Sequence, residues 1–269
     1  MKAFPLLLSL GTAVAGVSPA WPEPVRTDIN IVTAIDTSDS ISANEMHMQI
    51  EGLAAALRSP QVLRAFRSGP EGRVGFTVFA WHDRSFPRVA AWTVIASAAD
   101  AEAAARQIEQ RLDIDVETEA RQAGAELYSL YQPKQNSFYG VTTFYSGRLT
   151  NLSGAIDHGI EVLDSAPFAA TRTIINIIGE GADNVGEGAA PARDRAVRKG
   201  MIVNGLVSSG QPASLAYYRS DVVGGTGSFV VTVASRDSFA EAIVRKFMGD
   251  VIAANTGHEP RTESFRGIR

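Results

Sequence analysis

The chain has 269 residues, of which 45% are hydrophobic and 20% charged, a balance typical of a globular protein with a sizeable core. The net charge of −4 and the scattered basic residues argue against nucleic-acid binding. The chain contains no cysteine, which excludes thiol catalysis, thiolate metal sites and disulfides, so the core alone has to hold the fold.

The first twenty residues have the pattern of a signal peptide. Lys2 precedes a short apolar run over residues 4–17, and small residues follow at 18–20, where a signal peptidase cuts. We expect residues 1–20 to be removed, so that the mature chain begins at Trp21; an uncleaved amphipathic N-terminus is the alternative. The apolar run is too short to span a bilayer, and no later stretch is long enough, so no transmembrane segment is predicted. A chain processed in this way is periplasmic or secreted.

Strand and helix patterns alternate along the rest of the chain. The β-branched segment 29–35 indicates a buried strand, and a polar loop, Asp36 to Ser40, follows it. Ser42 and Glu45 form a capping box at the start of a helix. The alternation predicts an α/β fold: a doubly wound, mainly parallel sheet with helices on both faces. The further expected strands are 74–79, 89–95, 173–178, 201–207 and 229–233, and the further expected helices are 98–112, 152–163, 191–199 and 239–252.

No linker divides the mature chain, so we expect one domain over residues 21–254. The segment 113–147 interrupts the alternation and is interpreted as an insertion. Its aromatic residues suit either a partner surface or packing onto the domain, and the sequence leaves both open. Residues 255–269 are basic, polar and aperiodic, which predicts a disordered tail.

The polar loop Asp36-Thr37-Ser38-Asp39-Ser40 carries the strongest chemical signal. In an open α/β sheet, ligands gather at the carboxyl ends of the strands, where one carboxylate and two hydroxyls spaced by two can turn toward one point. Oxygen-only ligands with few carboxylates suit Mg²⁺, with Mn²⁺ or Ca²⁺ as alternatives. An EF-hand is excluded, because Ile41 and His47 stand where that loop needs Gly and Glu. The pentad alone is equally compatible with a turn that caps the helix.

The pentad resembles the metal-ion-dependent adhesion site of von Willebrand factor A domains, with Asp36, Ser38 and Ser40 as metal ligands. Thr150, in the loop before the predicted helix 152–163, matches the threonine ligand of that family. The resemblance extends over nearly the whole mature chain. The closing segments, including Tyr217-Tyr218, look like those of an exported bacterial single-domain subfamily of unknown function.

The third element of the resemblance departs from the family pattern. Glu180 stands where the family usually has an aspartate before a glycine. Glutamate is one methylene longer, so Glu180 could bind the metal directly, bind through a water, or distort the site. Asp183, three residues further on, could take its place.

The resemblance implies a binding protein and not an enzyme. In the family, the cation keeps one open position, which a carboxylate of the partner fills, so we expect recognition of an exposed Asp or Glu of a protein or peptide. Asp39, Asp183 and Tyr145 are expected beside such a partner. The alternatives are a metal-assisted hydrolase, for which Asp39, Asp183 and Glu187 are the nearby candidate bases, and a structural domain with a vestigial metal loop.

Overall fold

The structure, a computed structural model, describes residues 23–38, 41, 43–83, 85–110, 149–208, 210–233 and 238–256. The predicted signal peptide, the predicted capping residue Ser42, the predicted insertion and most of the predicted tail lie outside these residues. No helix among the described residues is both long enough and apolar enough to cross a membrane.

A six-stranded sheet forms the centre of the protein, with the strand order β3-β2-β1-β4-β5-β6. All neighbouring strands are parallel except β2 and β3. The connection between β2 and β3 is too short for a crossover, so the chain turns back and makes an antiparallel edge. The prediction of a mainly parallel sheet is therefore confirmed. The strands are β1 (Arg26–Asp36), β2 (Val74–Trp81), β3 (Arg88–Ile95), β4 (Ala169–Gly179), β5 (Ile202–Val207) and β6 (Val230–Thr232).

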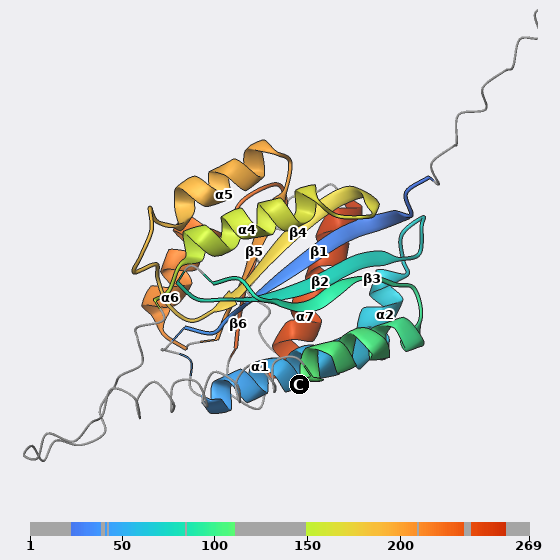
Figure 1. Ribbon diagram of the computed structural model, residues 1–269, viewed down its shortest axis with the longest axis horizontal. Coiled ribbons are helices and arrows are strands. Elements are labelled where there is room, and N and C mark those ends of the chain that lie inside the picture. The colour runs from blue at the N-terminus through green and yellow to red at the C-terminus, as the bar shows by residue number, and fades with distance from the viewer. Residues whose placement is uncertain are drawn as a thin grey trace, which may run out of the picture.

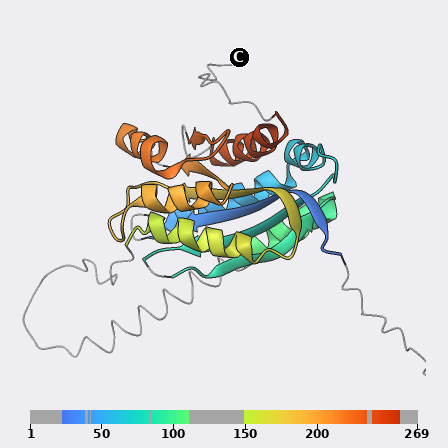
Figure 2. The ribbon, with the colours of Figure 1, turned by 90° about the horizontal axis from the view of Figure 1, so that it is seen from above.

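Helices cover both faces of the sheet, as Figures 1 and 2 show. One face carries α1 (Ala43–Arg58), α2 (Pro60–Phe66), a helix over residues 98–110 and α7 (Phe239–Thr256). The other carries α4 (Leu152–Asp164), α5 (Ala189–Arg198) and the π-helical turn η1 (Tyr218–Val222), which continues from α6 (Pro212–Tyr217). The sequence pattern did not predict α2, α6 and η1, because helices of five to seven residues are too short to show a clear period.

The sheet separates two hydrophobic clusters, and strand β1 contributes residues to both. Ile29, Ile31 and Ile35 point to the cluster under α1 and α7, whereas Val32 and Ala34 point to the cluster under α4 and α5. Because both faces are covered, ten of the eleven residues of β1 are buried, which explains its continuous apolar sequence. This arrangement also carries the end of β1 into the interior.

A buried polar network ties α7 to the sheet. The Lys246 Nζ atom lies 2.5 Å from both Asn176 Oδ1 and Asp250 Oδ1. The Asp250 carboxylate also accepts from Asn176 Nδ2 at 2.7 Å and from Asn204 Nδ2 at 2.9 Å. All four side chains are at most 2% exposed. Burial lowers the pKa of Lys246, and the Asp250 carboxylate opposes that shift. Each charge is therefore tolerated only because the other is present.

We predict that Lys246→Met lowers the free energy of unfolding by about 3–5 kcal/mol, because it leaves the Asp250 carboxylate buried without its cation. Chemical denaturation measures this change. The exposed Arg245, on the same helix, provides the control: Arg245→Met should cost less than about 1 kcal/mol. The double variant Lys246→Met/Asp250→Leu should lose less stability than the two single losses together, and additive losses would contradict the proposed coupling.

Candidate functional site

Three loops meet at the carboxyl ends of β1 and β4. Strand β1 ends at Asp36, and its parallel neighbour β4 ends at Gly179. The segment before α4 is fastened to the loop after β4, because the Thr150 N–H donates to Asn184 Oδ1 at 2.9 Å and the Asn184 N–H donates to the Thr150 carbonyl at 3.0 Å. Thr150 is thus held to the loop that also carries Glu180.

Asp36 is the most unusual residue at this edge. Its side chain is fully buried, and its Oδ1 atom accepts a hydrogen bond from the Ser38 N–H at 2.8 Å. Its Oδ2 atom has no hydrogen-bond partner in the described part of the chain. Burial raises the pKa of Asp36 to about 7; hydrogen bonding to Ser38 and to the Glu180 backbone opposes the rise, and the negative charge of Glu180 adds to it. Among the described residues the carboxylate therefore lacks the opposite charge that an ionised group inside a protein requires.

Four of the five predicted metal ligands lie in these loops. The Ser38 and Thr150 side chains are buried, and Glu180 is half-buried and close enough to Asp36 for its charge to act on that carboxyl. Ser40, the fifth predicted ligand, lies outside the described residues, as do the predicted partner-binding residues Asp39 and Tyr145. The residue types that these loops carry, two carboxylates and two buried hydroxyls, are the oxygen ligands that hard cations prefer.

Asp183 has the contacts of a helix-capping residue. Its Oδ1 atom accepts from the Leu152 N–H, and its Oδ2 atom accepts from the Ser153 N–H at 3.0 Å. Asn151 accepts from the Gly154 N–H at 2.8 Å, so the first turn of α4 is capped by two side chains. Burial raises the pKa of Asp183, and these backbone hydrogen bonds oppose the rise. The cap fixes the start of α4, and with it the position of Thr150, two residues before the helix.

Further residues position the end of β1 and were not predicted as site residues. The Thr37 N–H donates to the Trp81 carbonyl at 2.9 Å, and the Thr37 hydroxyl lies 2.9 Å from His82 Nδ1. These contacts hold the start of the loop after β1, which carries Ser38, against the end of β2. Asn184 was also missed, because a single Asn in a loop carries no periodic or motif signal. Its role depends on a contact with a residue 34 positions away.

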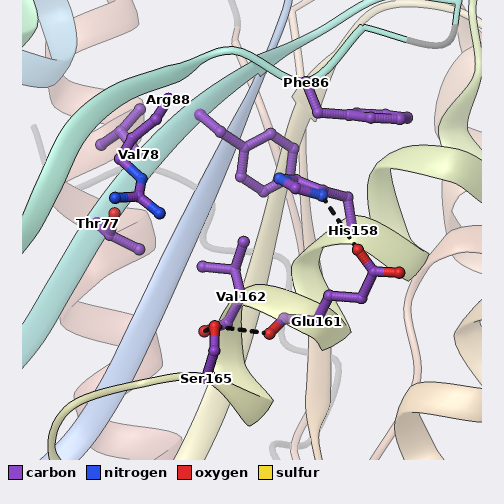
Figure 3. A pocket seen from close by; sticks show the side chains of 9 residues that line it. Thr77, Val78, Phe86, Arg88, His158, Glu161, Val162 and Ser165 are labelled. Atoms are coloured by element: carbon purple, nitrogen blue, oxygen red, sulfur yellow. Dashed lines mark hydrogen bonds and ion pairs between the residues drawn. The ribbon is translucent and has the colours of Figure 1, made fainter.

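A groove of about 290 Å³ lies between β2, β3 and α4, and none of the residues that line it belongs to these loops (Figure 3). The His158 ring stacks on Phe86 with centroids 5.0 Å apart and meets Phe79 edge-on at 4.8 Å. His158 Nδ1 is 3.5 Å from a carboxylate oxygen of Glu161, and the Ser165 hydroxyl donates to the Glu161 carbonyl at 2.9 Å. These side chains contact one another, so we interpret the groove as a place where α4 packs against the sheet.

Among the described residues, no three His, Cys, Asp or Glu side chains gather as a metal site would require. A cation site at the end of β1 therefore needs neutral oxygen ligands. Ser38 and Thr150 are buried hydroxyl residues in the loops that carry predicted ligands.

The comparison with protein families gives one match, to the family described as "Protein of unknown function (DUF1194)", over residues 26–141 and 136–255. The comparison with curated proteins finds no match.

Solved structures of von Willebrand factor A domains share the fold. The chain matches the domain of the type V pili tip protein Mfa5 from Porphyromonas gingivalis with a TM-score of 0.53 and 10% identity, covering 87% of this chain and 98% of that one. It matches the pilus adhesin SpaC from Lactobacillus rhamnosus GG with a TM-score of 0.51 and 11% identity, covering 85% of this chain and 31% of that one.

A third match is the von Willebrand factor type A protein from Catenulispora acidiphila, with a TM-score of 0.50 and 13% identity, covering 84% of this chain. The chain spans only 43% of the length of that protein. At these identities the likeness shows the fold alone, and the fold is that of a von Willebrand factor A domain.

We predict that Asp36→Asn stabilises the metal-free protein in a pH-dependent way. The pKa of Asp36 is raised from 3.8 to about 7 in the folded state, so its ionisation opposes folding increasingly as the pH rises between these values. In EDTA, the gain in unfolding free energy from Asp36→Asn should approach zero near pH 4 and reach about 1–4 kcal/mol at pH 8.

Denaturation curves of both proteins at several pH values measure this gain. Asp194→Asn, at a half-exposed surface carboxylate, serves as the control and should show no such trend. A gain from Asp36→Asn that is the same at pH 4 and pH 8 would contradict the burial argument.

Proposed function

We propose a function for this chain, which belongs to the family described as "Protein of unknown function (DUF1194)". We propose that it is an exported binding protein. It would recognise an acidic group of a protein or peptide through a bound divalent cation. The observation that carries the proposal is the Asp36 carboxylate: it is fully buried at the end of the central strand, and its Oδ2 atom has no partner in the described part of the chain. A carboxylate with a free oxygen in such a place is suited to bind a cation.

The neighbouring side chains fit a hard divalent cation. Ser38 and Thr150 offer neutral hydroxyls, and Asp36 and Glu180 together offer two negative charges. Two carboxylates neutralise a divalent ion, and the hydroxyls leave its charge available to a further ligand. Mg²⁺ suits this set, and Mn²⁺ shares its preference for oxygen ligands. A bound cation would supply a Lewis-acidic position for an incoming carboxylate.

Glu180 is the better candidate for the second acidic ligand. Both carboxylate oxygens of Asp183 accept hydrogen bonds from the first turn of α4, so moving that side chain would uncap the helix. The charge of Glu180, in contrast, already acts on Asp36. We therefore infer that the longer glutamate replaces the usual aspartate in this chain.

An acidic partner group would be attracted by the bound cation and not by the protein's own charges at the site, which are the carboxylates of Asp36 and Glu180. An incoming Asp or Glu would form a direct ionic bond to the bound cation. The site is partly shielded from water, and such a bond is stronger there than in bulk water. Matches to a pilus tip domain and a pilus adhesin support binding over catalysis. The signal-peptide pattern of residues 1–20 supports export.

We predict that the purified protein binds Mg²⁺ and Mn²⁺ and that Asp36→Ala weakens both affinities at least tenfold, about 1.4 kcal/mol. Glu180→Ala should weaken binding in the same direction, whereas Glu180→Asp, which restores the usual residue of the family, should keep it. Calorimetric titration measures these affinities, and Asp194→Ala is the control for a surface carboxylate outside the site.

Partner recognition is tested with the same proteins as bait. Exported proteins should be retained by the wild type in Mg²⁺ and lost in EDTA, and Asp36→Ala should retain none of them. A wild-type protein that binds neither Mg²⁺ nor Mn²⁺ would refute the proposed function. Equal metal affinity in the wild type and Glu180→Ala would leave the function standing and refute the role of Glu180.

A further inference from the structure

The side chain of Tyr218 crosses two strands over two glycines. A Cβ atom added to Gly205 of β5 would lie 2.7 Å from Tyr218 Cδ1, and one added to Gly179 of β4 would lie 2.7 Å from the Tyr218 hydroxyl oxygen. Contacts this short are not found for real Cβ atoms, so the fully buried ring can lie here only because both positions are glycine. The two glycines form a track that leads from η1 to the end of β4.

The hydroxyl at the end of this track lies next to Asp36. The position of an added Cβ at Gly179 is 3.0 Å from Asp36 Oδ2 and 3.3 Å from Trp81 Cζ2. The Tyr218 and Asp36 oxygens therefore both lie within 3.0 Å of one point. In the described part of the chain, Asp36 Oδ2, the Tyr218 hydroxyl and Trp81 Nε1 have no hydrogen-bond partner. Two donors and one acceptor without partners thus surround the same glycine.

Such a cluster calls for an explanation, because buried polar groups in proteins almost always have a partner. A phenylalanine would fill the track as well as Tyr218, and a buried hydroxyl costs free energy unless it is used. A tyrosine hydroxyl carries its proton at neutral pH, so Tyr218 can act as a donor. Both oxygens lie within 3.0 Å of one point, so a shift of the carboxylate or one bridging water would join them.

We propose that Tyr218 is a positioning residue of the metal site, whose hydroxyl donates to Asp36 Oδ2 and fixes the orientation in which the carboxylate binds the cation. The inference rests on the proposed function, since it assigns a role toward the same metal. Residues that hydrogen-bond to a metal ligand and orient it commonly contribute ten- to a hundredfold to metal affinity, so their removal weakens binding by that factor. Nothing in the sequence signals this role, because Tyr218 is 182 positions from Asp36 by residue number.

The neighbouring Tyr217 offers a matched control. It is half-buried, and its hydroxyl accepts a hydrogen bond from the Ala189 N–H at 3.4 Å, at the start of α5. Tyr217→Phe and Tyr218→Phe therefore remove the same atom from adjacent residues of one helical segment, and only Tyr218 faces Asp36.

The experiment compares the wild type, Tyr218→Phe, Tyr217→Phe and Asp36→Ala by calorimetric titration with Mn²⁺ and by thermal melting in EDTA. We expect Tyr218→Phe to weaken Mn²⁺ binding about tenfold without lowering the melting temperature in EDTA, because the hydroxyl acts on the metal site and not on packing. Tyr217→Phe should keep the affinity within about twofold, and Asp36→Ala should lose it.

A second variant tests the same idea without removing the hydroxyl. Gly205→Ala displaces the ring at its other end and should also weaken Mn²⁺ binding. Unchanged affinity in Tyr218→Phe and Gly205→Ala, beside a wild type that binds and an Asp36→Ala that does not, overturns the role of Tyr218 and leaves the proposed function standing. A lower melting temperature with unchanged affinity overturns it in favour of packing. A wild type that does not bind Mn²⁺ or Mg²⁺ overturns both.

Discussion

Asp36 lies at the end of a central strand of the sheet that separates the two hydrophobic clusters, so its carboxylate leaves water and gains no ion pair among the described residues. The surrounding structure depends on this desolvation. Trp81 and Gly179 stand beside the carboxylate on the neighbouring strands, and Ser38 and Glu180 start the loops that enclose it. In the metal-free protein the burial of an ionised Asp36 opposes folding, and a bound cation would remove that cost.

Buried charged groups lie on both faces of the sheet, and they are paired on one face and not on the other. Under α7, the Lys246 and Asp250 charges are paired, and the amides of Asn176 and Asn204 complete the hydrogen bonds, so that network holds α7 in one arrangement. Under α4 and η1, Asp36 keeps an oxygen without a partner. A satisfied network stabilises a unique packing, whereas an unsatisfied group is free to bind a ligand. This difference is why we place the function at Asp36 and not at the larger cluster of polar side chains.

The elements that the sequence predicted are those whose pattern is local. The apolar segment before Asp36 and the helices α1, α4 and α7 follow from the spacing of hydrophobic residues along a short stretch. The mainly parallel sheet follows from the alternation of such strands and helices along the chain. The missed elements α2, α6 and η1 are shorter than two turns, so no period could identify them. Asn176 and Asn204 also escaped notice, because an asparagine within an apolar strand has a partner only once α7 has packed against the sheet.

For the candidate site, the sequence by itself determined the residue types and their order: a carboxylate and hydroxyls after the first strand, a threonine before a helix and an acid after β4. These features are local, because a motif and the strand or helix beside it occupy consecutive residues. Only the tertiary structure decided that the Asp36 oxygen lacks a partner, that Asp183 caps α4, and that Tyr218 reaches Asp36 over two glycines. Burial and hydrogen-bond partners depend on segments far apart in the chain, so they exist only when the sheet and helices have packed.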